Sequence, residues 1–406
     1  MPYPTEIRLQ FYVYGCSQTR TDTLDGGSVI LINCLKRWIN NGHRVHLFTS
    51  QESYARIQKY GLPGISYTIV PGLRHRRSVY LLYVMRTIKL LLVSRNRNHK
   101  NLVIYSVSDF WPDSIPAAFH KFRHRSAKWV AAFYLFAPNP FSTGSPYKGK
   151  RFITGLLYYL SQIPIYLLVR KYADMVFVTS EPDRGRFISA RLPSDRVVAV
   201  RGGVDFELVK AVPNQEKKFD AVYLGRFHPQ KGVLELLDIW KYVCQRKHNA
   251  MLAMIGTGEL EEEVRGRVEK LGLQRNIKLF GFRDGIEKIK ILRESKIVVH
   301  PATYDSGGMA AAEAMACGLP GVSFDLEALK TYYPKGMLKT PCFNIEEFAG
   351  NILRLLDDRN LYAKMGKDAL EQAKDWDWKT RSLELLERIN ALFYGQSPHS
   401  SLEVHS

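Results

Sequence analysis

The feature that most constrains the fold is a regular alternation of short apolar runs and amphipathic segments in residues 219–325. "FDAVYLGRF", "AMLAMIGTGE" and "IVVHPA" are typical of buried strands, whereas "GVLELLDIWKYVCQR" and "ELEEEVRGRVEKLG" have helical periodicity. Strands that alternate with helices form parallel sheets with helices on both faces. The sequence therefore predicts an α/β unit in the second half of the chain.

The first half repeats this pattern less regularly. "IRLQFYVYG" predicts a first strand, "TLDGGS" a glycine-containing loop, "VILINCLKRWINNG" a helix and "HRVHLFTS" a second strand. At 406 residues the chain suits two domains. We expect a Rossmann-like domain at 1–205, a polar linker at 206–218, a second Rossmann-like domain at 219–376, a C-terminal helix at 377–394 that packs back on the first domain, and a flexible tail at 395–406.

The net charge of +19 is concentrated in the first half. Residues 1–200 hold 28 Lys and Arg against 10 Asp and Glu, while residues 201–406 hold 30 against 29. A basic half is compatible with nucleic acid, an anionic membrane or a phosphorylated substrate. Because no nucleic-acid motif occurs and long apolar runs accompany the cations, we expect no nucleic-acid partner.

The five cysteines are scattered and no two have CxxC spacing, which indicates neither a disulfide framework nor a zinc site. The N-terminal stretch "MPYPTEIRLQFYVYG" has no basic segment followed by a long apolar run, so we expect no signal peptide. These features favour a reducing, cytoplasmic compartment.

Ligands of open parallel sheets bind beyond the carboxyl ends of the strands, where the chemistry-bearing residues of the second half are expected. In "GRFHPQKG", Gly225, Arg226 and Lys231 follow a strand, and two cations around a glycine turn suit a diphosphate. Two solvated surface cations are the alternative. In "IGTGELEEEV", Gly256 and Gly258 permit close approach of a ligand, but glycines are also ordinary turn residues.

Two further points concern the nucleotide. Glu261 occupies the last position of the dinucleotide fingerprint GxGxxG, so nicotinamide binding is disfavoured. "FGFRD" (280–284) places Phe282 in an aromatic–glycine loop that suits a nucleobase, or that is a plain turn.

"YDSGGMAAAEAM" (304–315) carries two carboxylates, Asp305 and Glu313, on either side of two glycines. We expect a turn that leads into a helix starting near Gly307 or Gly308. The amides of Gly307, Gly308 and Met309 at a helix start suit a phosphate. A buried alanine-rich helix capped by Asp305 is the alternative, and it leaves Glu313 in need of a partner.

The order "LGRF…KG", "IGTGE", "FGF" and "DSGGMAAAEAMACGLPGV" resembles the retaining glycosyltransferases of family 4 (glycosyl transferases group 1). That family has two glutamates with seven residues between them, followed by A-M-A-x-G-x-P. The resemblance is specific over about 219–325, and "DGGSVILINCLKRWINNGHRVHLFTS" extends it to the first half. It implies the GT-B fold: two Rossmann-like domains whose parallel sheets face a central cleft, with the acceptor bound by the first and the nucleotide-sugar by the second.

The resemblance also implies roles for individual residues. Arg226 and Lys231 would neutralise the donor diphosphate, Glu313 would hold the ribose, and Asp305 would contact the donor sugar. The amides of 307–309 would lie near the phosphates and sugar, and Gly26 and Gly27 would form the first-domain loop that closes over the donor. The reaction expected is transfer of a sugar from a UDP- or GDP-sugar, with retention, to a glycan or lipid-linked acceptor in surface glycan or glycolipid synthesis, without metal or another cofactor.

Two residues depart from the family pattern. Asp305 stands where the first glutamate usually is and is one methylene shorter. Tyr134, in "VAAFYLF", stands where many members have a histidine near the reacting carbon. A tyrosine can hydrogen-bond a sugar but is not a cation at neutral pH. These departures leave open a non-catalytic partner that kept the fold, and a nucleotide-sugar epimerase of the same fold is a further alternative.

Residues 152–169 contain no charge and are bracketed by "KGKR" and "RK". This length is close to that of a spanning helix, but Pro164, Ser161 and Gln162 interrupt the apolar run. Three interpretations stay open: a membrane span, peripheral contact with an anionic membrane through the basic first domain, and core helices with solvated basic ends. Peripheral contact on the inner face of the cell membrane would suit a polyprenyl-linked or other lipid-linked acceptor.

Overall fold

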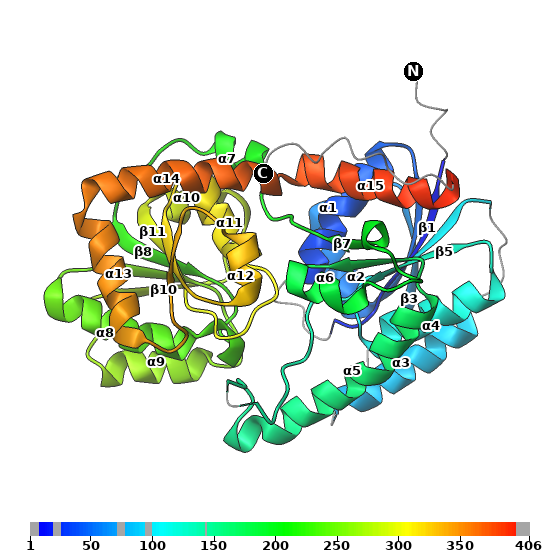
Figure 1. Ribbon diagram of the computed structural model, residues 1–406, viewed down its shortest axis with the longest axis horizontal. Coiled ribbons are helices and arrows are strands. Elements are labelled where there is room, and N and C mark those ends of the chain that lie inside the picture. The colour runs from blue at the N-terminus through cyan, green and yellow to red at the C-terminus, as the bar shows by residue number, and fades with distance from the viewer. Residues whose placement is uncertain (1–7, 19–25, 71–77, 94–99, 143, 395–406) are drawn as a thin grey trace. The chain divides into compact units, whose positions relative to one another are not determined.

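The computed structural model describes residues 8–18, 26–70, 78–93, 100–142 and 144–394. The chain divides into two units (Figure 1). The first comprises the described residues of Met1–Ala137, Leu157–Val200 and Lys379–Ser406, and the second those of Pro138–Leu156 and Arg201–Trp378. The tail expected at 395–406 and residues 23–25 of the expected glycine loop lie outside the described residues.

The first unit is built on a seven-stranded sheet in the order β3-β2-β1-β4-β5-β6-β7, and every adjacent pair is parallel. Its inner strands are buried on both faces, as is usual for parallel sheets. The strands are β1 Gln10–Gly15, β2 Arg44–Ser50, β3 Ile65–Val70, β4 Leu102–Ser106, β5 Lys128–Ala132, β6 Met175–Val178 and β7 Val197–Ala199.

Right-handed crossovers place α1 and α2 on one face of this sheet and α3 to α6 on the other. Figure 1 shows α3, α4 and α5 gathered along one side of the unit. The helices are α1 Gly26–Asn40, α2 Gln51–Ile57, α3 Val79–Val93, α4 Trp111–Arg123, α5 Phe152–Tyr172, α6 Glu181–Phe187 and α15 Trp378–Tyr394, with short 3-10 turns at Gln58–Tyr60, Gly149–Arg151 and Ser194–Arg196.

The second unit is built on a six-stranded sheet in the order β10-β9-β8-β11-β12-β13, again with every adjacent pair parallel. β8 and β11 lie side by side at its centre, although 70 residues separate them in the chain. The strands are β8 Phe219–Leu224, β9 Leu252–Ile255, β10 Ile277–Gly281, β11 Ser295–His300, β12 Gly321–Phe324 and β13 Met337–Thr340.

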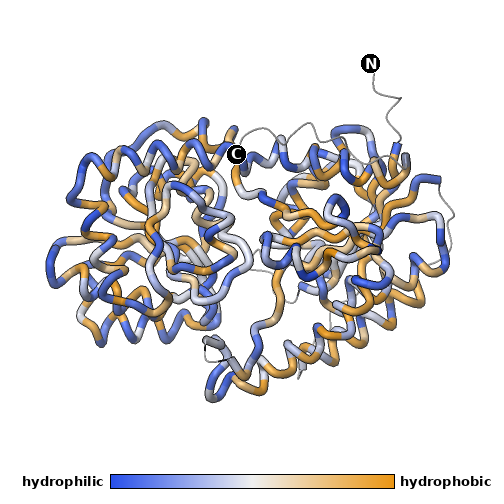
Figure 2. The backbone as a smooth tube through the Cα atoms, in the orientation of Figure 1, coloured by the Kyte–Doolittle hydropathy of each residue, from blue (hydrophilic) through white to orange (hydrophobic). Residues whose placement is uncertain are grey.

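Apolar clusters cover both faces of the second sheet. One cluster joins α8, α9 and α13 to the sheet, and the other joins α10, α11 and α14. In Figure 2 the strands of both units are coloured mainly as hydrophobic, whereas α9 is mainly hydrophilic. The helices are α7 Phe206–Ala211, α8 Val233–Arg246, α9 Glu261–Lys270, α10 Gly285–Arg293, α11 Met309–Ala316, α12 Glu327–Tyr332, α13 Ile345–Asp357 and α14 Arg359–Ala373, with 3-10 turns at Pro229–Lys231 and Lys374–Trp376. The two parallel α/β sheets confirm the fold class predicted from the sequence.

The crossings between the units add detail that the sequence pattern does not contain. The chain passes from the first unit to the second after Val200, and α7 occupies the first part of the expected linker. Pro138–Leu156, which lies inside the first half of the chain, belongs to the second unit. Helix α15 belongs to the first unit, where Trp38 Nε1 donates a hydrogen bond of 3.2 Å to the carbonyl of Ser382.

Candidate functional site

The loops that follow the neighbouring strands β8 and β11 meet at the carboxyl edge of the second sheet. The backbone N–H groups of Thr303 and Tyr304 donate to the carbonyl of Gln230, at 3.0 and 3.2 Å. Lys231 ends the 3-10 turn Pro229–Lys231 in the first loop, and Asp305 lies in the second. Because the strands are adjacent and parallel, residues 74 positions apart are brought into contact.

Asp305 is buried and held by four groups. Lys231 Nζ lies 2.6 Å from its Oδ2, and His300 Nε2 lies 3.3 Å from the same oxygen. Its Oδ1 accepts from the backbone N–H groups of Ser306 at 3.0 Å and Gly307 at 3.4 Å. Burial alone would raise the pKa of Asp305, but the Lys231 charge and the His300 hydrogen bond hold it well below its usual range. Asp305 is therefore ionised at neutral pH.

His300 is a candidate site residue that the sequence pattern did not single out. It is the last residue of β11, is buried, and burial lowers its pKa although Asp305 opposes this effect. A neutral imidazole that donates from Nε2 to Asp305 fits this environment. The sequence feature that could have identified His300 is its position at the carboxyl end of a predicted strand, five residues before Asp305.

Helix α11 begins at Met309, directly after the glycine pair. In the described part of the chain, no hydrogen-bond partner occurs for the N–H groups of Gly308 and Met309, as is usual in the first turn of a helix. A Cβ added to Gly308 would lie 2.0 Å from Tyr333 Oη, so only glycine fits here. This helix start supplies free amide donors beside Asp305, the arrangement that anions favour.

Glu313 finds its partner in the protein itself. Lys288 Nζ of α10 lies 2.8 Å from Glu313 Oε1 and 3.0 Å from Asp284 Oδ1. Burial alone would lower the pKa of Lys288, but these two carboxylates raise it overall. Lys288 is the second residue that sequence reasoning missed, because α10 precedes α11 by a whole strand and a lysine on a predicted helix resembles a solvated surface charge.

The glycines near the site have structural roles. Gly256 has φ +146°, and a Cβ there would lie 1.9 Å from the carbonyl oxygen of Gly225. A Cβ on Gly258 would lie 2.3 Å from the carbonyl oxygen of Phe227. These close approaches, together with a hydrogen bond of 2.9 Å from Phe227 N to Thr257 O, pack the β8 and β9 loops against each other. Packing between loops is thus sufficient to explain both glycines of the IGTG turn.

The remaining candidates of the second unit are exposed. Arg226 lies at the surface of the β8 loop and forms no ion pair with any residue that the structure describes. Phe282 is 42% exposed and follows Gly281, which has φ +68°. Both side chains are accessible to a ligand.

The candidates of the first unit are defined by their neighbours in that unit. Gly26 and Gly27 are the first residues of α1. Tyr134 follows β5, and its hydroxyl lies 2.7 Å from the hydroxyl of Tyr105. Thr179 Oγ1 donates to the carbonyl of Tyr134 at 2.6 Å, which fixes the backbone between β5 and β6.

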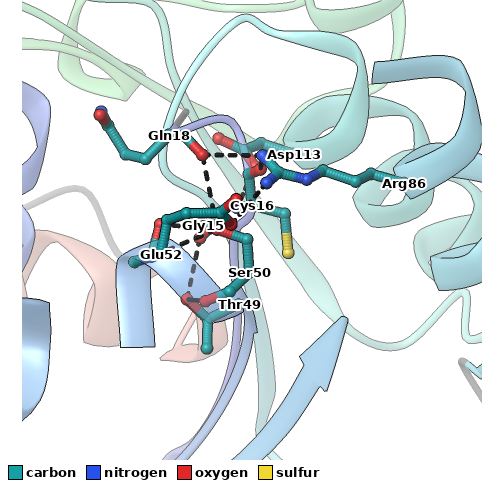
Figure 3. A network of polar contacts seen from close by, with 9 residues as sticks. Gly15, Cys16, Gln18, Thr49, Ser50, Glu52, Arg86 and Asp113 are labelled. Atoms are coloured by element: carbon teal, nitrogen blue, oxygen red, sulfur yellow. Dashed lines mark hydrogen bonds and ion pairs between the residues drawn. The ribbon is translucent and has the colours of Figure 1, made fainter. Parts of the chain in front are cut away.

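A buried polar network supports the loop that follows β1 (Figure 3). Arg86 of α3 donates to the carbonyls of Cys16 and Gln18, each at 2.7 Å, and pairs with Glu52 at 2.7 Å. Asp113 accepts from the Cys16 amide at 2.6 Å and from Ser108 Oγ at 2.5 Å. Burial raises the pKa of Asp113 to about 7, against the lowering effect of these hydrogen bonds and of the Arg86 charge.

Two kinds of comparison place the chain among known proteins. A family model described as Glycosyl transferases group 1 matches residues 205–372. The D-inositol 3-phosphate glycosyltransferase of Corynebacterium glutamicum is 25% identical over 48% of this chain and 52% of its own length. The poly(glycerol-phosphate) alpha-glucosyltransferase of Bacillus subtilis is 24% identical over 43% of this chain and 26% of its own length. The chain thus spans about half the length of these curated relatives, or less.

Solved structures resemble almost the whole chain. HepE of Anabaena, in complex with UDP and glucose, has a TM-score of 0.70 at 17% identity and covers 95% of this chain and 99% of its own. Sucrose-phosphate synthase of Thermosynechococcus elongatus has a TM-score of 0.71 at 18% identity, with 96% and 100% covered. At this identity the likeness concerns the fold, which is GT-B. The family match assigns residues 205–372, most of the second unit, to the glycosyl transferases group 1, and the chain as a whole shares the GT-B fold with these solved structures.

Proposed function

We propose that the protein is a retaining glycosyltransferase that moves a sugar from a nucleotide-sugar to a glycan or lipid-linked acceptor in the synthesis of a surface glycan or glycolipid. The observation that carries this proposal is the cluster of Lys231, His300 and Asp305 beside the free amides of the α11 start. It joins a cation and anion-binding amides, which suit a diphosphate, to an ionised carboxylate, which suits sugar hydroxyls.

The donor diphosphate would lie against Lys231, the exposed Arg226 and the N–H groups of Gly308 and Met309. Asp305 would accept hydrogen bonds from hydroxyls of the transferred sugar. Its contact with Lys231 keeps it ionised and therefore an acceptor on both oxygens. Glu313, held by Lys288, would accept hydrogen bonds from the ribose hydroxyls.

In the transfer step the bond between the anomeric carbon and the diphosphate oxygen breaks, and a bond from the acceptor oxygen to the same carbon forms on the same face. The acceptor hydroxyl proton passes to the departing diphosphate. Lys231, Arg226 and the helix start stabilise the charge that builds on the leaving oxygen. In this mechanism neither Asp305 nor Glu313 acts as acid or base. By the family resemblance, Tyr134 would stand where many members have a histidine and would act as a neutral hydrogen-bonding group.

A UDP-sugar is the proposed donor in preference to a GDP-sugar. Support comes from similar folds whose structures hold this nucleotide, namely HepE with UDP and glucose and Staphylococcus aureus TarM with UDP. The phosphate and ribose contacts proposed above serve either nucleotide equally, so discrimination would come from the base.

The test is nucleotide release. The purified protein is mixed in turn with UDP-glucose, UDP-N-acetylglucosamine, UDP-galactose and GDP-mannose, and free UDP or GDP is measured with and without a lipid extract as acceptor source. We expect UDP release from at least one UDP-sugar and none from GDP-mannose. Conversion of a donor to its epimer would favour the epimerase alternative. Donor binding by calorimetry without any release or transfer would favour a non-catalytic partner.

A further inference from the structure

Helices α3 and α5 expose two stripes of aliphatic side chains. On α3 the stripe consists of Leu81, Val84, Ile88 and Leu92, and on α5 it consists of Leu157, Leu160, Ile163 and Leu167; we call these eight residues the aliphatic face. Consecutive residues of each stripe are three or four positions apart, which puts each set along one side of its helix. Leu92 is 74% exposed and Leu167 is 57% exposed, so these side chains are not part of the core.

The two stripes lie in the same helical layer. Both helices cover the same face of the first sheet, and α4 lies between them in the chain order (Figure 1). Tyr83 of α3 contacts Phe110, which in turn contacts Tyr158 of α5, with ring centroids 5.4 and 6.1 Å apart. The opposite sides of the helices, including Leu90 and Val169, are buried in the core. The aliphatic face therefore points away from the sheet.

Helices α3, α4 and α5 carry positive charge and no exposed acid. On the same face of the sheet, Glu181 of α6 is partly exposed and pairs with Arg184 at 3.1 Å. Helices α3 and α5 contain no Asp or Glu, and the one acid of α4, Asp113, is fully buried. Lys89 of α3, Arg123 of α4, and Arg170 and Lys171 at the end of α5 are at least partly exposed. Cations that border an apolar surface complement the phosphates of an anionic bilayer, while their alkyl chains follow the apolar surface.

The position of α5 in the fold favours contact with a membrane surface over a membrane-spanning helix. The helical segment Gly149–Tyr172 has the length and hydropathy of a span, with a mean hydropathy of 1.6. However, it connects β5 to β6, which pair directly in register from Val130 and Met175. Ile165 and Val169 of the same helix are buried in the core of the first unit. A span would pull these residues out of the core, whereas contact in the plane of the interface leaves them in place.

The composition favours lipid over another protein. Protein interfaces are enriched in aromatic residues, Met and Arg at their centre. Here Leu, Ile and Val form the stripes of α3 and α5, and the exposed Phe119 and Phe122 of α4 add aromatic side chains of the kind that membrane-surface helices also carry. Acidic residues, with which the cations of a second copy of this basic surface could pair, are absent from α3 and α5. We propose that the aliphatic face binds the surface of an anionic lipid bilayer, with its side chains in the interfacial region and the bordering cations at the lipid phosphates. This proposal does not depend on the proposed transferase activity.

The experiment is flotation of the full chain with vesicles. Vesicles of pure phosphatidylcholine are compared with vesicles that contain 30% phosphatidylglycerol, a composition chosen for the assay, at low and high NaCl. We expect the protein to float with the anionic vesicles at low salt, and to float about ten-fold less at high salt or without phosphatidylglycerol. Failure of the unaltered protein to float with anionic vesicles at low salt would overturn the proposal.

Matched variants separate the two contributions. The test variant is Ile88→Gln/Leu160→Gln, which replaces two residues of the aliphatic face whose side chains are 52% and 51% exposed. The control variant is Ile286→Gln/Leu370→Gln, which replaces two residues of the second unit whose side chains are 50% and 42% exposed. We expect the face variant to bind at least about ten-fold less than the control. Equal binding by the two variants would contradict a role for the face, and because the changed residues are exposed, equal melting temperatures should show that both variants fold.

The charge contribution is tested in the same assay. Lys89→Gln/Arg170→Gln/Lys171→Gln is compared with Lys241→Gln/Lys364→Gln/Lys367→Gln, which removes three exposed lysines from the second unit. We expect only the first triple variant to lose the dependence on phosphatidylglycerol. Sedimentation of the lipid-free protein tests whether the aliphatic face binds a second copy of the chain instead. The lipid proposal would be overturned if the protein self-associates, if Ile88→Gln/Leu160→Gln abolishes this self-association, and if no vesicle binding is seen.

Discussion

Asp113 in the first unit and Asp305 in the second are both buried carboxylates that follow the carboxyl end of a strand, yet their pKa values move in opposite directions. Asp305 is in contact with the ammonium group of Lys231, which holds its pKa well below the usual range. Asp113 accepts its hydrogen bonds from uncharged donors, and burial raises its pKa to about 7. Burial alone therefore does not decide the charge of a carboxylate, because a cation in contact reverses the effect of desolvation.

Because Asp305 is paired with a cation and Asp113 is not, we expect the two carboxylates to have different roles. An ionised, cation-paired carboxylate in a site with free amides can exchange its partner for a ligand. A carboxylate that holds a backbone amide and a serine hydroxyl within a closed network supports the local structure (Figure 3). The following predictions test this distinction, from the largest expected effect to the smallest.

Loss of either member of the second-unit pair should abolish most of the activity. For Lys231→Met and for Asp305→Asn, we expect the rate of sugar transfer to fall about 10²–10³-fold, because the charge that stabilises the leaving diphosphate or the contact to the sugar is lost. The measurement is UDP release under saturating donor. Lys247→Met, which removes only a surface pair with Asp357, is the matched control. Full activity of Asp305→Asn would mean that Asp305, like Asp113, is structural.

Glu313 should affect donor binding more than the chemical step. For Glu313→Ala we expect donor affinity, measured by calorimetry, to fall about ten-fold or more, since a hydrogen bond from the ribose to a charged group is lost. Lys288 retains Asp284 as a partner in this variant. Glu313→Gln serves as the isosteric control for folding, and unchanged donor affinity in Glu313→Ala would argue against the ribose contact.

Asp113 of the first unit should make the free energy of unfolding depend on pH. The pKa of Asp113 is about 7 in the folded protein and 3.8 without the protein environment, so the unfolded state ionises first as pH rises. Stability from this group is present below pH 4 and is lost as pH rises through 7. Asp113→Asn should remove that loss, so that the variant loses about 1–3 kcal/mol less stability than the unaltered protein between pH 5 and pH 8.

Urea unfolding at the two pH values provides the measurement. Burial raises the pKa of Asp109 to about 6. Because Asp109 remains in the variant, part of the decrease in stability between the two pH values remains as well. Asp305→Asn is the contrasting control, because Asp305 stays ionised in the folded protein throughout this range and should contribute no slope. A steeper loss of stability in Asp113→Asn than in the unaltered protein would contradict the prediction.

The smallest effect is expected from metal removal. Because Lys231, Arg226 and the amides of the α11 start carry the proposed stabilisation of the leaving group, EDTA treatment should change UDP release less than about two-fold. The measurement is turnover before and after chelation, followed by addition of Mg²⁺ or Mn²⁺. Loss of turnover that either metal restores would show that these protein groups are insufficient.

The sequence predicted the two parallel α/β sheets because period-2 and period-3.6 patterns are local properties of the chain. It also located Lys231 and Asp305 at the ends of predicted strands, where parallel sheets place their ligands. It could not reveal His300 or Lys288 as their partners, because those contacts depend on which strands and helices become neighbours. Similarly, Gly256 and Gly258 looked like ligand-binding glycines, whereas close backbone packing is enough to require them.

The segment 152–169 illustrates the same limit. Its composition was compatible with a span, a surface helix or a core helix, since hydropathy counts residues without regard to their surroundings. The tertiary structure buries one side of α5 against the sheet and leaves the other exposed. The sequence by itself thus determined the fold class, the family resemblance of the second unit and the excess of charge in the first half. Only the tertiary structure decided which carboxylate meets a cation and which apolar side chains meet solvent, because both depend on contacts between segments far apart in the chain.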